Sequence, residues 1–230
     1  MTKTHLISGA TSGIGQAIAQ RLQAKGDRIV AMVRDAAQAK DLGVDGLVVC
    51  DFAAPEGVRE AVAKFEEPIH SFINCAATTL GKAVFTSSAA EVAHVLNVNL
   101  ISPMMVCAEL KKNVQAGGAI LLVSSQSAYR GGFDDAYNVS KGGINTFIKA
   151  LAIKMAPAVR VFGIAPGITL ATRMTRERKA DDLAPIREQI PLKRFGDVNE
   201  LAELVDSLLG PAGAYITGAV IDVNGGNYLR

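Results

Sequence analysis

The sequence predicts a doubly wound α/β fold, in which helices cover both faces of a mostly parallel β-sheet. Short apolar segments of strand length alternate along the chain with longer amphipathic segments of helical periodicity. This alternation is typical of parallel strands joined by right-handed crossover helices. No repeat or linker divides the 230 residues, so we expect a single domain over residues 1–230.

The first half of the chain contains four predicted strands and two predicted helices. The strands are expected at residues 5–8, 28–33, 46–50 and 71–74, and the helices at 14–25 and 55–65. The first helix shows the pattern best, because Ile14, Ala17, Ile18 and Leu22 recur on one face.

The second half continues the alternation, with one exception. Strands are expected at residues 119–125, 159–165 and 219–223, and helices at 89–110, 135–155 and 198–209. Pro103 should kink or interrupt the first of these helices, and Asp197 with Glu200 forms a capping box at the last. Residues 170–192 are polar and charged, and they follow a strand at the sheet edge where such folds bind ligands. They are therefore predicted to form a helical lid over a substrate pocket.

Composition argues against several classes of protein. The formal net charge is only +2, which gives no electrostatic case for binding nucleic acid or a membrane. The apolar runs are of strand length, and no signal peptide is apparent. The cysteines Cys50, Cys75 and Cys107 are odd in number and scattered, which fits reduced thiols in a cytoplasmic protein. The spacing of cysteines and histidines indicates no metal site.

A glycine-rich turn follows the first predicted strand and opens the first helix. It reads S-G-A-T-S-G-I-G, from Ser8 to Gly15. Glycines let a pyrophosphate approach the backbone closely, and the free N–H groups of a helix N-terminus attract its negative charge. The spacing of Gly9, Gly13 and Gly15 differs from the usual G-x-G-x-x-G of dinucleotide-binding turns.

Arg34 follows the second predicted strand and bears on which dinucleotide the turn would bind. An acidic residue at this place accepts hydrogen bonds from a ribose hydroxyl, whereas an arginine accommodates a 2′-phosphate. Arg34 therefore favours NADP(H) over NAD(H). The adjacent Asp35 reverses the preference if it occupies the ribose position instead.

Tyr137 and Lys141 are the pair most indicative of chemistry. They lie four residues apart on a predicted helix, so they share one face. A nearby cation stabilises phenolate, and we expect Lys141 to lower the pKa of Tyr137 and make it a proton donor and acceptor.

Other polar residues lie at positions suited to the same site. Ser124 and Ser125 end the fifth predicted strand, where a hydroxyl can polarise a carbonyl. Asn99 lies in an apolar helical stretch and must find hydrogen-bond partners there, either in the site or in the local backbone.

These motifs together resemble the short-chain dehydrogenase/reductase family in its compact, single-domain Rossmann form. The resemblance covers essentially the whole chain. Its motifs are, in order, Gly9/Gly13/Gly15, Asp51, N-C-A-A from Asn74, Asn99, Ser125, Tyr137 with Lys141, Pro166-Gly167 and the closing V-N-G-G at residues 223–226.

The resemblance implies an oxidoreductase that transfers a hydride between NADP(H) and a small carbonyl or secondary alcohol substrate. Tyr137 would be the general acid or base, Lys141 would tune it and hold the nicotinamide ribose, Ser125 would bind the substrate oxygen, and Asn99 would support a proton relay. The cofactor would be bound by Gly9, Thr11, Ser12, Gly13, Ile14, Gly15, Arg34, Asp51, Phe52, Asn74, Ala76, Tyr137, Lys141, Pro166, Gly167 and Ile168. A homo-oligomer, a tetramer or dimer, is also implied.

Some positions depart from the family pattern. Cys75 and Ala77 replace residues of the usual N-N-A-G, and Ala171 stands where a threonine is frequent. The loop before Tyr137 is one residue short, so either Ser124 or Ser125 can be aligned with the family serine. Strand register favours Ser125.

Three alternative functions remain open. The run I-A-P-G-I-T-L also resembles the pteridine-reductase branch of the family. A non-catalytic NADP(H)-binding sensor or scaffold would keep the same fold. An epimerase or dehydratase would use the same Tyr–Lys pair, but such relatives usually carry a larger C-terminal substrate region.

Overall fold

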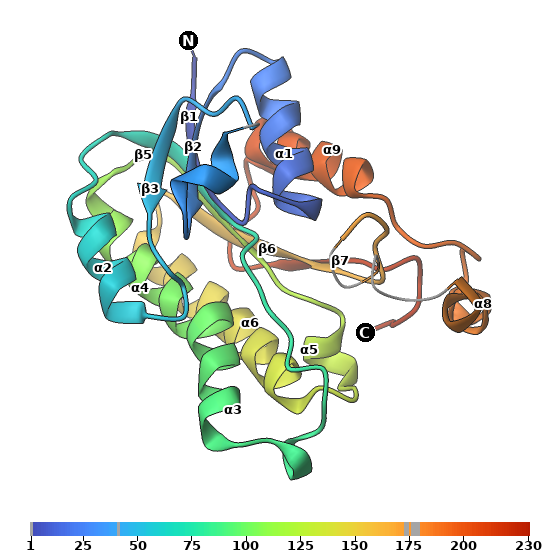
Figure 1. The fold of residues 1–230 in the computed structure, drawn as a ribbon. Helices are drawn as coiled ribbons and strands as arrows, with labels where there is room; N and C mark the ends of the chain where they lie inside the picture. The colour runs from blue at the N-terminus through green and yellow to red at the C-terminus, as the bar shows by residue number, and fades with distance from the viewer. Residues whose placement is uncertain (1, 41, 173–174, 176–179) are drawn as a thin grey trace.

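The computed structural model contains a seven-stranded sheet in which every pair of neighbouring strands is parallel (Figure 1). It describes the whole chain except residues 1, 41, 173–174 and 176–179. The strands are β1 Thr4–Ser8, β2 Arg28–Val33, β3 Gly46–Val49, β4 Ile69–Asn74, β5 Val114–Val123, β6 Arg160–Pro166 and β7 Val220–Val223. The spatial order is β3-β2-β1-β4-β5-β6-β7. The predicted doubly wound parallel sheet is confirmed.

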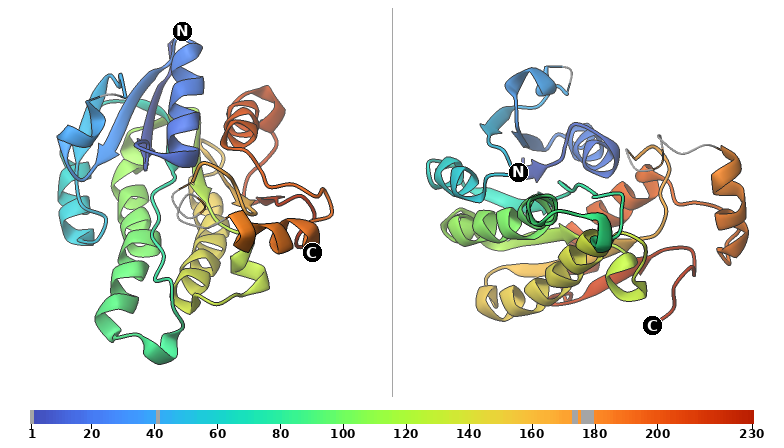
Figure 2. Two further views of the ribbon diagram at one scale, coloured as in Figure 1. Left: turned by 45° about the vertical axis from the view of Figure 1, so that its right-hand side comes forward. Right: turned by 60° about the horizontal axis from the view of Figure 1, so that its bottom comes forward.

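Helices cover both faces of the sheet (Figures 1 and 2). One layer holds α1 Gly13–Ala24 and α9 Val198–Leu209, and the other holds α2 Pro55–Ala63, α4 Ser102–Glu109 and α6 Asp135–Met155. Successive strand residues supply the two cores, because side chains alternate across a strand: Leu6 of β1 packs with the α2–α4–α6 layer, and Ile7 packs with the α1–α9 layer.

The order of the strands fixes where a ligand can bind. The chain runs outward from β1 to β2 and β3, then returns to place β4 on the other side of β1. The connections after β1 and β4 therefore diverge to opposite faces, which leaves a crevice at the carboxyl ends of these two strands. The glycine turn follows β1 and the N-C-A-A segment follows β4, so both lie at this crevice.

The long helix predicted at residues 89–110 is interrupted before Pro103, as expected. It consists of α3 Ala89–Leu96, a π-helical turn η3 Asn97–Ile101, and α4, whose second residue is Pro103. Proline lacks an N–H and its ring collides with the carbonyl four residues earlier, so a wider turn at this point relieves the clash. The turn includes Asn99, whose side chain is fully buried.

Other boundaries differ modestly from the predicted ones. β5 begins at Val114 rather than at residue 119, because an irregularity opposite residues 69–71 lets the strand start early. The short helices α5 Ser127–Arg130, η1 Ala36–Ala39, η2 Val84–Thr86, η4 Leu110–Lys112 and η5 Pro211–Gly213 were not predicted. Each spans four residues or fewer, too short to show a helical period in the sequence.

The segment predicted as a lid contains the helix α8 Ala180–Gln189, so its helical character is confirmed. Figure 1 shows α8 at the edge of the molecule, beyond β7. Residues 173–174 and 176–179 of the predicted lid lie outside the described residues. The capping box predicted for α9 is present, with Asp197 and Glu200 bonding reciprocally.

One helical stretch among the described residues, Ala89–Lys112, has the length and mean hydropathy, 1.3, of a membrane span. The same stretch comprises α3, the π-helical turn and α4, which pack against α2 and α6 in the helical layer. A core helix of an α/β protein meets the same criteria, so the observation is weak evidence for a membrane.

Candidate active site

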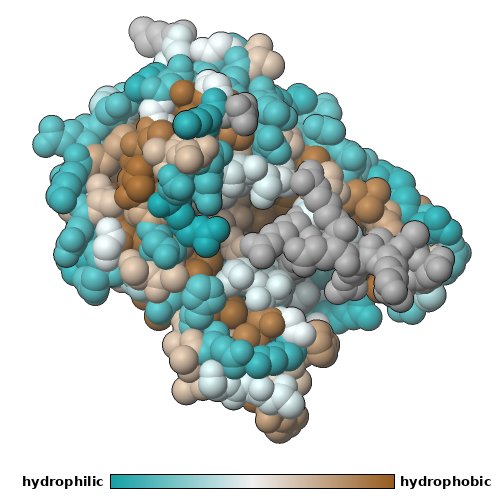
Figure 3. Space-filling model, in the orientation of Figure 1, coloured by the Kyte–Doolittle hydropathy of each residue, from teal (hydrophilic) through white to brown (hydrophobic). Residues whose placement is uncertain are grey.

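A cavity of about 560 Å³ lies at the carboxyl ends of β1, β2 and β4. The space-filling view shows a hollow near the centre of the face drawn in Figure 1, with both polar and apolar side chains around it (Figure 3). Ten of the residues predicted to bind a cofactor line it, namely Gly9, Thr11, Ser12, Gly13, Ile14, Gly15, Arg34, Asp51, Phe52 and Ala76. The topological switch point therefore brings together ten predicted residues that are up to 67 residues apart in the sequence, from Gly9 to Ala76.

The glycine turn owes its shape to close approaches that no side chain permits. Gly9 has φ +70°, and a Cβ there would lie 2.8 Å from the backbone nitrogen of Ala76. A Cβ on Gly15 would lie 2.3 Å from the carbonyl oxygen of Gly9. The N-terminus of α1 is thus drawn tightly against the turn, and Ser12 at the N-cap makes no side-chain capping bond. Such a helix end presents free N–H groups to an anion.

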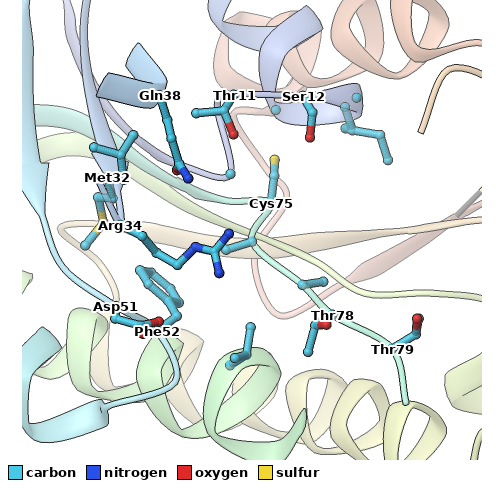
Figure 4. A pocket seen from close by; sticks show the side chains of 18 of the residues that line it. Thr11, Ser12, Met32, Arg34, Gln38, Asp51, Phe52, Cys75, Thr78 and Thr79 are labelled. Atoms are coloured by element: carbon cyan, nitrogen blue, oxygen red, sulfur yellow. The ribbon is translucent and has the colours of Figure 1, made fainter. Parts of the chain in front are cut away.

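Arg34 extends its guanidinium toward the middle of the cavity, between Asp51 with Phe52 and the turn residues Thr11 and Ser12 (Figure 4). The neighbouring Asp35 is engaged elsewhere. It is the N-cap of η1, and its Oδ1 accepts a hydrogen bond from the Ala37 N–H at 2.9 Å. The arginine, not the carboxylate, is therefore the charged side chain of this pair that lines the cavity.

The predicted residues after β3 and β4 have structural partners of their own. The Oδ1 of Asp51 accepts from the Ala53 N–H at 2.9 Å, while the exposed carboxylate borders the cavity. Asn74 is fully buried below the cavity, where its Oδ1 accepts from the Ser8 hydroxyl at 2.7 Å. The same hydroxyl oxygen accepts from the Ala76 N–H at 3.3 Å, so Ser8 ties the ends of β1 and β4 together.

Tyr137, Lys141 and Ser125 form a second, largely buried cluster at the junction of β5 and α6. Their exposed fractions are 8%, 2% and 7%. The Lys141 Nζ donates to the Val123 carbonyl at 2.8 Å and lies 5.7 Å from the centre of the Tyr137 ring. The Ser125 side chain lies near enough to the Tyr137 phenol to lower its pKa, against the effect of burial. This arrangement places two hydroxyl groups together, as binding of one substrate oxygen requires.

The expectation that Lys141 lowers the pKa of Tyr137 is wrong for this arrangement. Burial raises the pKa of the phenol, the Ser125 hydrogen bond opposes that rise, and the Asp134 carboxylate adds to it. Burial also lowers the pKa of Lys141 to about 8. Removal from water disfavours the charged form of each group, and it is the largest cause of both shifts.

The two candidate serines point in different directions. The Ser124 hydroxyl donates to the Asn145 Oδ1 at 2.5 Å, inside the packing between β5 and α6. Ser125 lies next to Tyr137, and its Oγ accepts from the Ser127 N–H at 3.1 Å, which starts the short helix α5. The alternation of side chains along the strand separates the pair, and Ser125 is the one beside the phenol.

Asn99 joins the two halves of the site. Its Oδ1 accepts from the Thr78 N–H at 2.8 Å, and its Nδ2 donates to the Thr78 carbonyl at 2.8 Å. Nδ2 also donates to Ser140 Oγ at 3.0 Å, and that hydroxyl donates to the Tyr137 carbonyl at 2.7 Å. Thr78 lines the cavity, so Asn99 connects the cavity wall to the helix that carries Tyr137.

Pro166, Gly167 and Ile168 lie at the carboxyl end of β6 and do not line the cavity. The Pro166 carbonyl accepts from the Gln126 N–H at 3.0 Å, and a Cβ on Gly167 would lie 2.8 Å from the Asn224 Cα. These residues pack β6 between β5 and the segment after β7. Thr172 lines the cavity instead, next to the Ala171 position where the family pattern has its threonine.

Sequence patterns mark the remaining cavity residues only weakly. The cavity is also lined by residues that were not predicted to bind, namely Met32, Val33, Gln38, Cys50, Cys75, 77–81, His94, Val98 and Thr172. Position after a strand end marks Cys50, Cys75 and residues 77–81, whereas Met32 and Val33 lie within β2, and Gln38, His94 and Val98 lie in helical segments. All three cysteines are free, and burial raises the pKa of the Cys75 thiol to about 12, so it is inert as a nucleophile.

A parallel sheet of this strand order, with a glycine turn at its switch point and a Tyr–Lys pair beside it, defines an α/β oxidoreductase. A family model described as enoyl-(acyl carrier protein) reductase matches residues 9–227. The chain belongs to the short-chain dehydrogenase/reductase family.

Two relatives and one solved structure illustrate the similarity. The 3-oxoacyl-[acyl-carrier-protein] reductase of Mus musculus is 33% identical over 100% of this chain and 99% of its own length. The reductase of the same name, FabG, from Escherichia coli is 34% identical over 99% and 98%. A crystal structure of a glucose/ribitol-type short-chain dehydrogenase/reductase from Brucella melitensis superposes with a TM-score of 0.90 at 29% identity, covering 100% of both chains.

Proposed function

We propose that the protein is an NADP(H)-dependent reductase of a ketone group, with a 3-oxoacyl thioester as its substrate. The observation that carries the proposal is the pair of hydroxyls of Ser125 and Tyr137, held together beside the buried Lys141. A ketone oxygen that accepts from both hydroxyls becomes more electrophilic at its carbon, and Tyr137 then donates the proton that completes the alcohol.

The ionisation of the site favours the direction of reduction. Because burial raises the pKa of Tyr137, the phenol is protonated at neutral pH and is ready to donate. Lys141, with a pKa of about 8, retains a large cationic fraction at neutral pH and can hold a ribose hydroxyl. Ser125 keeps its position through its own bond to the Ser127 N–H.

The residues around the cavity fit a dinucleotide phosphate. The tight backbone turn at Gly9 and Gly15 leaves no room for a Cβ, and a glycine turn of this kind at a helix N-terminus suits a pyrophosphate. Arg34 offers a guanidinium for a 2′-phosphate. The nicotinamide, when bound, supplies the hydride. Asn74, predicted to bind the adenosine side of the cofactor, is fully buried and does not line the cavity, although its Nδ2 has no hydrogen-bond partner among the described residues.

The substrate class comes from the relatives. The two relatives described above are named 3-oxoacyl-[acyl-carrier-protein] reductases, whereas the family model is described as an enoyl-(acyl carrier protein) reductase. The paired hydroxyls favour the first reaction, because they suit a ketone oxygen that becomes an alcohol. The name of the second implies an alkene as the group reduced.

The experiment that tests the proposal compares two thioesters with NADPH. Acetoacetyl thioester should be reduced and crotonyl thioester should not, with NADPH oxidation followed by absorbance. Tyr137→Phe should lower kcat by at least a hundredfold with little change in the dissociation constant of NADPH. Undiminished turnover in this variant would refute the role of the phenol.

The same measurements separate the alternative functions. NADPH binding without turnover of any ketone would support a sensor or scaffold, and reduction of a pterin in place of the thioester would support the pteridine-reductase branch. We further propose that the protein is a cytoplasmic homo-oligomer, a tetramer or dimer. Val139 and Ile153 support this, because they lie on one face of α6 and are 64% and 81% exposed. Light scattering should show more than one subunit, and Ile153→Glu should reduce the mass.

A further inference from the structure

Asp134 joins two parts of the molecule that the proposed reaction uses. It is the N-cap of α6, and its Oδ1 accepts a hydrogen bond from the Tyr137 N–H at 3.0 Å. Its Oδ2 accepts from the N–H groups of Leu80 and Gly81, at 2.6 and 2.8 Å. The residue is only 9% exposed. One carboxylate therefore holds both the first turn of the helix and a loop that follows β4.

This loop forms part of the cavity wall. Thr78, Thr79, Leu80 and Gly81 all line the cavity, and none of them belongs to a helix or strand. With no backbone ladder to fix it, the loop depends on side chains for its position. Asn99 fixes the loop at Thr78, and Asp134 fixes it two and three residues further on, at Leu80 and Gly81.

We propose that Asp134 is a positioning residue of the reaction, which sets the place of the Tyr137 phenol relative to the cavity wall at residues 78–81. The inference rests on the proposed function. Asp134 itself touches neither substrate nor cofactor in this scheme, and it acts through the backbone of Tyr137 on one side and of Leu80 and Gly81 on the other.

A carboxylate suits this task better than any other side chain. Three N–H donors converge on it, and only an ionised carboxyl offers two oxygens that both accept. An asparagine has a single acceptor, and its NH₂ would face one set of donors. Asparagine still caps a helix as well as aspartate does. Asp134→Asn therefore keeps either the cap or the loop contact, but not both.

The charge of Asp134 has a second consequence at the phenol. It adds to the rise in the pKa of Tyr137, on which the Ser125 hydroxyl acts from the end of β5 and Lys141 faces the ring from the same helix. A substitution that removes the charge should lower the pKa of the phenol. Alcohol oxidation uses the phenolate as its base, so the limb of the pH profile on which the oxidation rate rises should shift to lower pH. A residue that merely supported the fold would leave that limb in place.

Asp135 provides a matched control. It lies next to Asp134, carries the same charge and is partly exposed, and its Oδ2 accepts a single bond from the Val84 N–H at 2.8 Å. Val84 does not line the cavity. Asp135→Asn thus removes the same charge and a loop contact, but leaves the cavity wall and the Tyr137 N–H unaffected.

The test measures the parent, Asp134→Asn, Asp134→Ser and Asp135→Asn. For each we would determine the thermal midpoint, the dissociation constant of NADPH by fluorescence, kcat and KM for acetoacetyl thioester, and the pH profile of the reverse oxidation. Both Asp134 variants should lower kcat by about tenfold or more, weaken NADPH binding several-fold and shift the oxidation limb to lower pH. Asp135→Asn should stay within twofold of the parent in each constant.

Two results would overturn the inference. One is an Asp134 variant whose kcat, NADPH affinity and pH limb all match the parent. The other is a loss of thermal stability alone, with unchanged constants at a temperature where the variant is folded. Failure of the proposed function is a different result, in which the parent itself reduces no ketone. NADPH affinity then still decides whether Asp134 positions the cavity wall, with parental affinity in both variants counting against it.

Discussion

At the scale of single residues, burial rather than charge pairing sets the ionisation of the proposed catalytic groups. Tyr137 and Lys141 are four residues apart on one helix face, yet each is driven toward its neutral form, with raised and lowered pKa values respectively. The sequence spacing alone suggested the opposite direction for the phenol. Depth below the surface decided the sign, and spacing along a helix carries no information on depth.

The first prediction concerns the phenol in the protein without cofactor. Because its pKa is raised, Tyr137 should titrate above the ordinary value of about 10. The ultraviolet absorbance difference between the parent and Tyr137→Phe isolates this group from Tyr129, Tyr215 and Tyr228. A transition below the ordinary value would show that Lys141 outweighs burial.

The second prediction concerns Arg34. Its guanidinium in the cavity should favour NADPH over NADH, since a planar fork of donors matches a phosphate. Arg34→Ala should weaken NADPH binding by about tenfold or more, the scale of a charge-assisted contact of about 1.5–3 kcal/mol, and leave NADH binding nearly unchanged. Asp35→Ala is the control and should retain the preference, because that carboxylate caps η1. Equal affinities in the parent would contradict the assignment.

At the scale of elements, the glycine turn is where backbone shape and binding depend most on one another. Gly15 lies in α1, and a Cβ at this position would come within 2.3 Å of the Gly9 carbonyl oxygen. Helix and turn cannot keep this distance if any side chain intervenes. The N-terminus of α1 would have to move away from the cavity.

The third prediction follows from that contact. Gly15→Ala should lower the free energy of unfolding by about 1–3 kcal/mol, the range for overpacking, and weaken NADPH binding at least tenfold. Gly57→Ala is the matched control, since Gly57 is exposed in α2 and its added Cβ meets nothing closer than 4.0 Å. It should stabilise the helix by about 0.5–1 kcal/mol. Denaturant titration and NADPH fluorescence measure both effects.

Sequence patterns predicted the elements well and their tertiary contacts poorly. The strands, the capping box of Asp197 and the interruption at Pro103 follow from local chemistry, which a sequence displays directly. The hydrogen bond from the Leu80 N–H to Asp134 does not follow from local chemistry, because the two residues lie 54 residues apart. An aspartate before a helix is equally expected as a simple N-cap. The preference for Ser125 over Ser124 does follow from the alternation of residues at a strand end, although the length of the loop before Tyr137 leaves it open and β5 itself ends at Val123.

At the scale of the whole molecule, a buried polar cluster that affects global stability lies at the amino-terminal ends of the central strands, away from the cavity. His5 of β1 is 1% exposed. Its Nδ1 lies 2.7 Å from Ser71 Oγ of β4, and its Nε2 lies 3.3 Å from Asp27 Oδ2, which precedes β2. The ring also meets the edge of His70 at 5.8 Å. Three strands at the centre of the sheet thus converge on one imidazole.

This cluster makes the stability of the fold depend on pH. Burial lowers the pKa of His5 to about 4, with Asp27 opposing and His70 and Lys3 adding to the shift. The unfolded chain, with an ordinary pKa of about 6.5, therefore binds the proton more readily than the folded one. Stability from His5 is complete above about pH 6.5 and decreases as the pH falls toward 4, with a slope approaching 1.4 kcal/mol per pH unit.

The fourth prediction tests this dependence by urea titration between pH 4.5 and 7.5. His5→Gln should be less stable than the parent at pH 7.5, yet lose less stability on acidification, because glutamine cannot accept the proton. The exposed His94 is the control, and His94→Gln should follow the parent at every pH. Parallel profiles for His5→Gln and the parent would assign the acid sensitivity to other groups. Since His5 and the cavity lie at opposite ends of β1, the NADPH affinity of folded His5→Gln should stay within twofold of the parent.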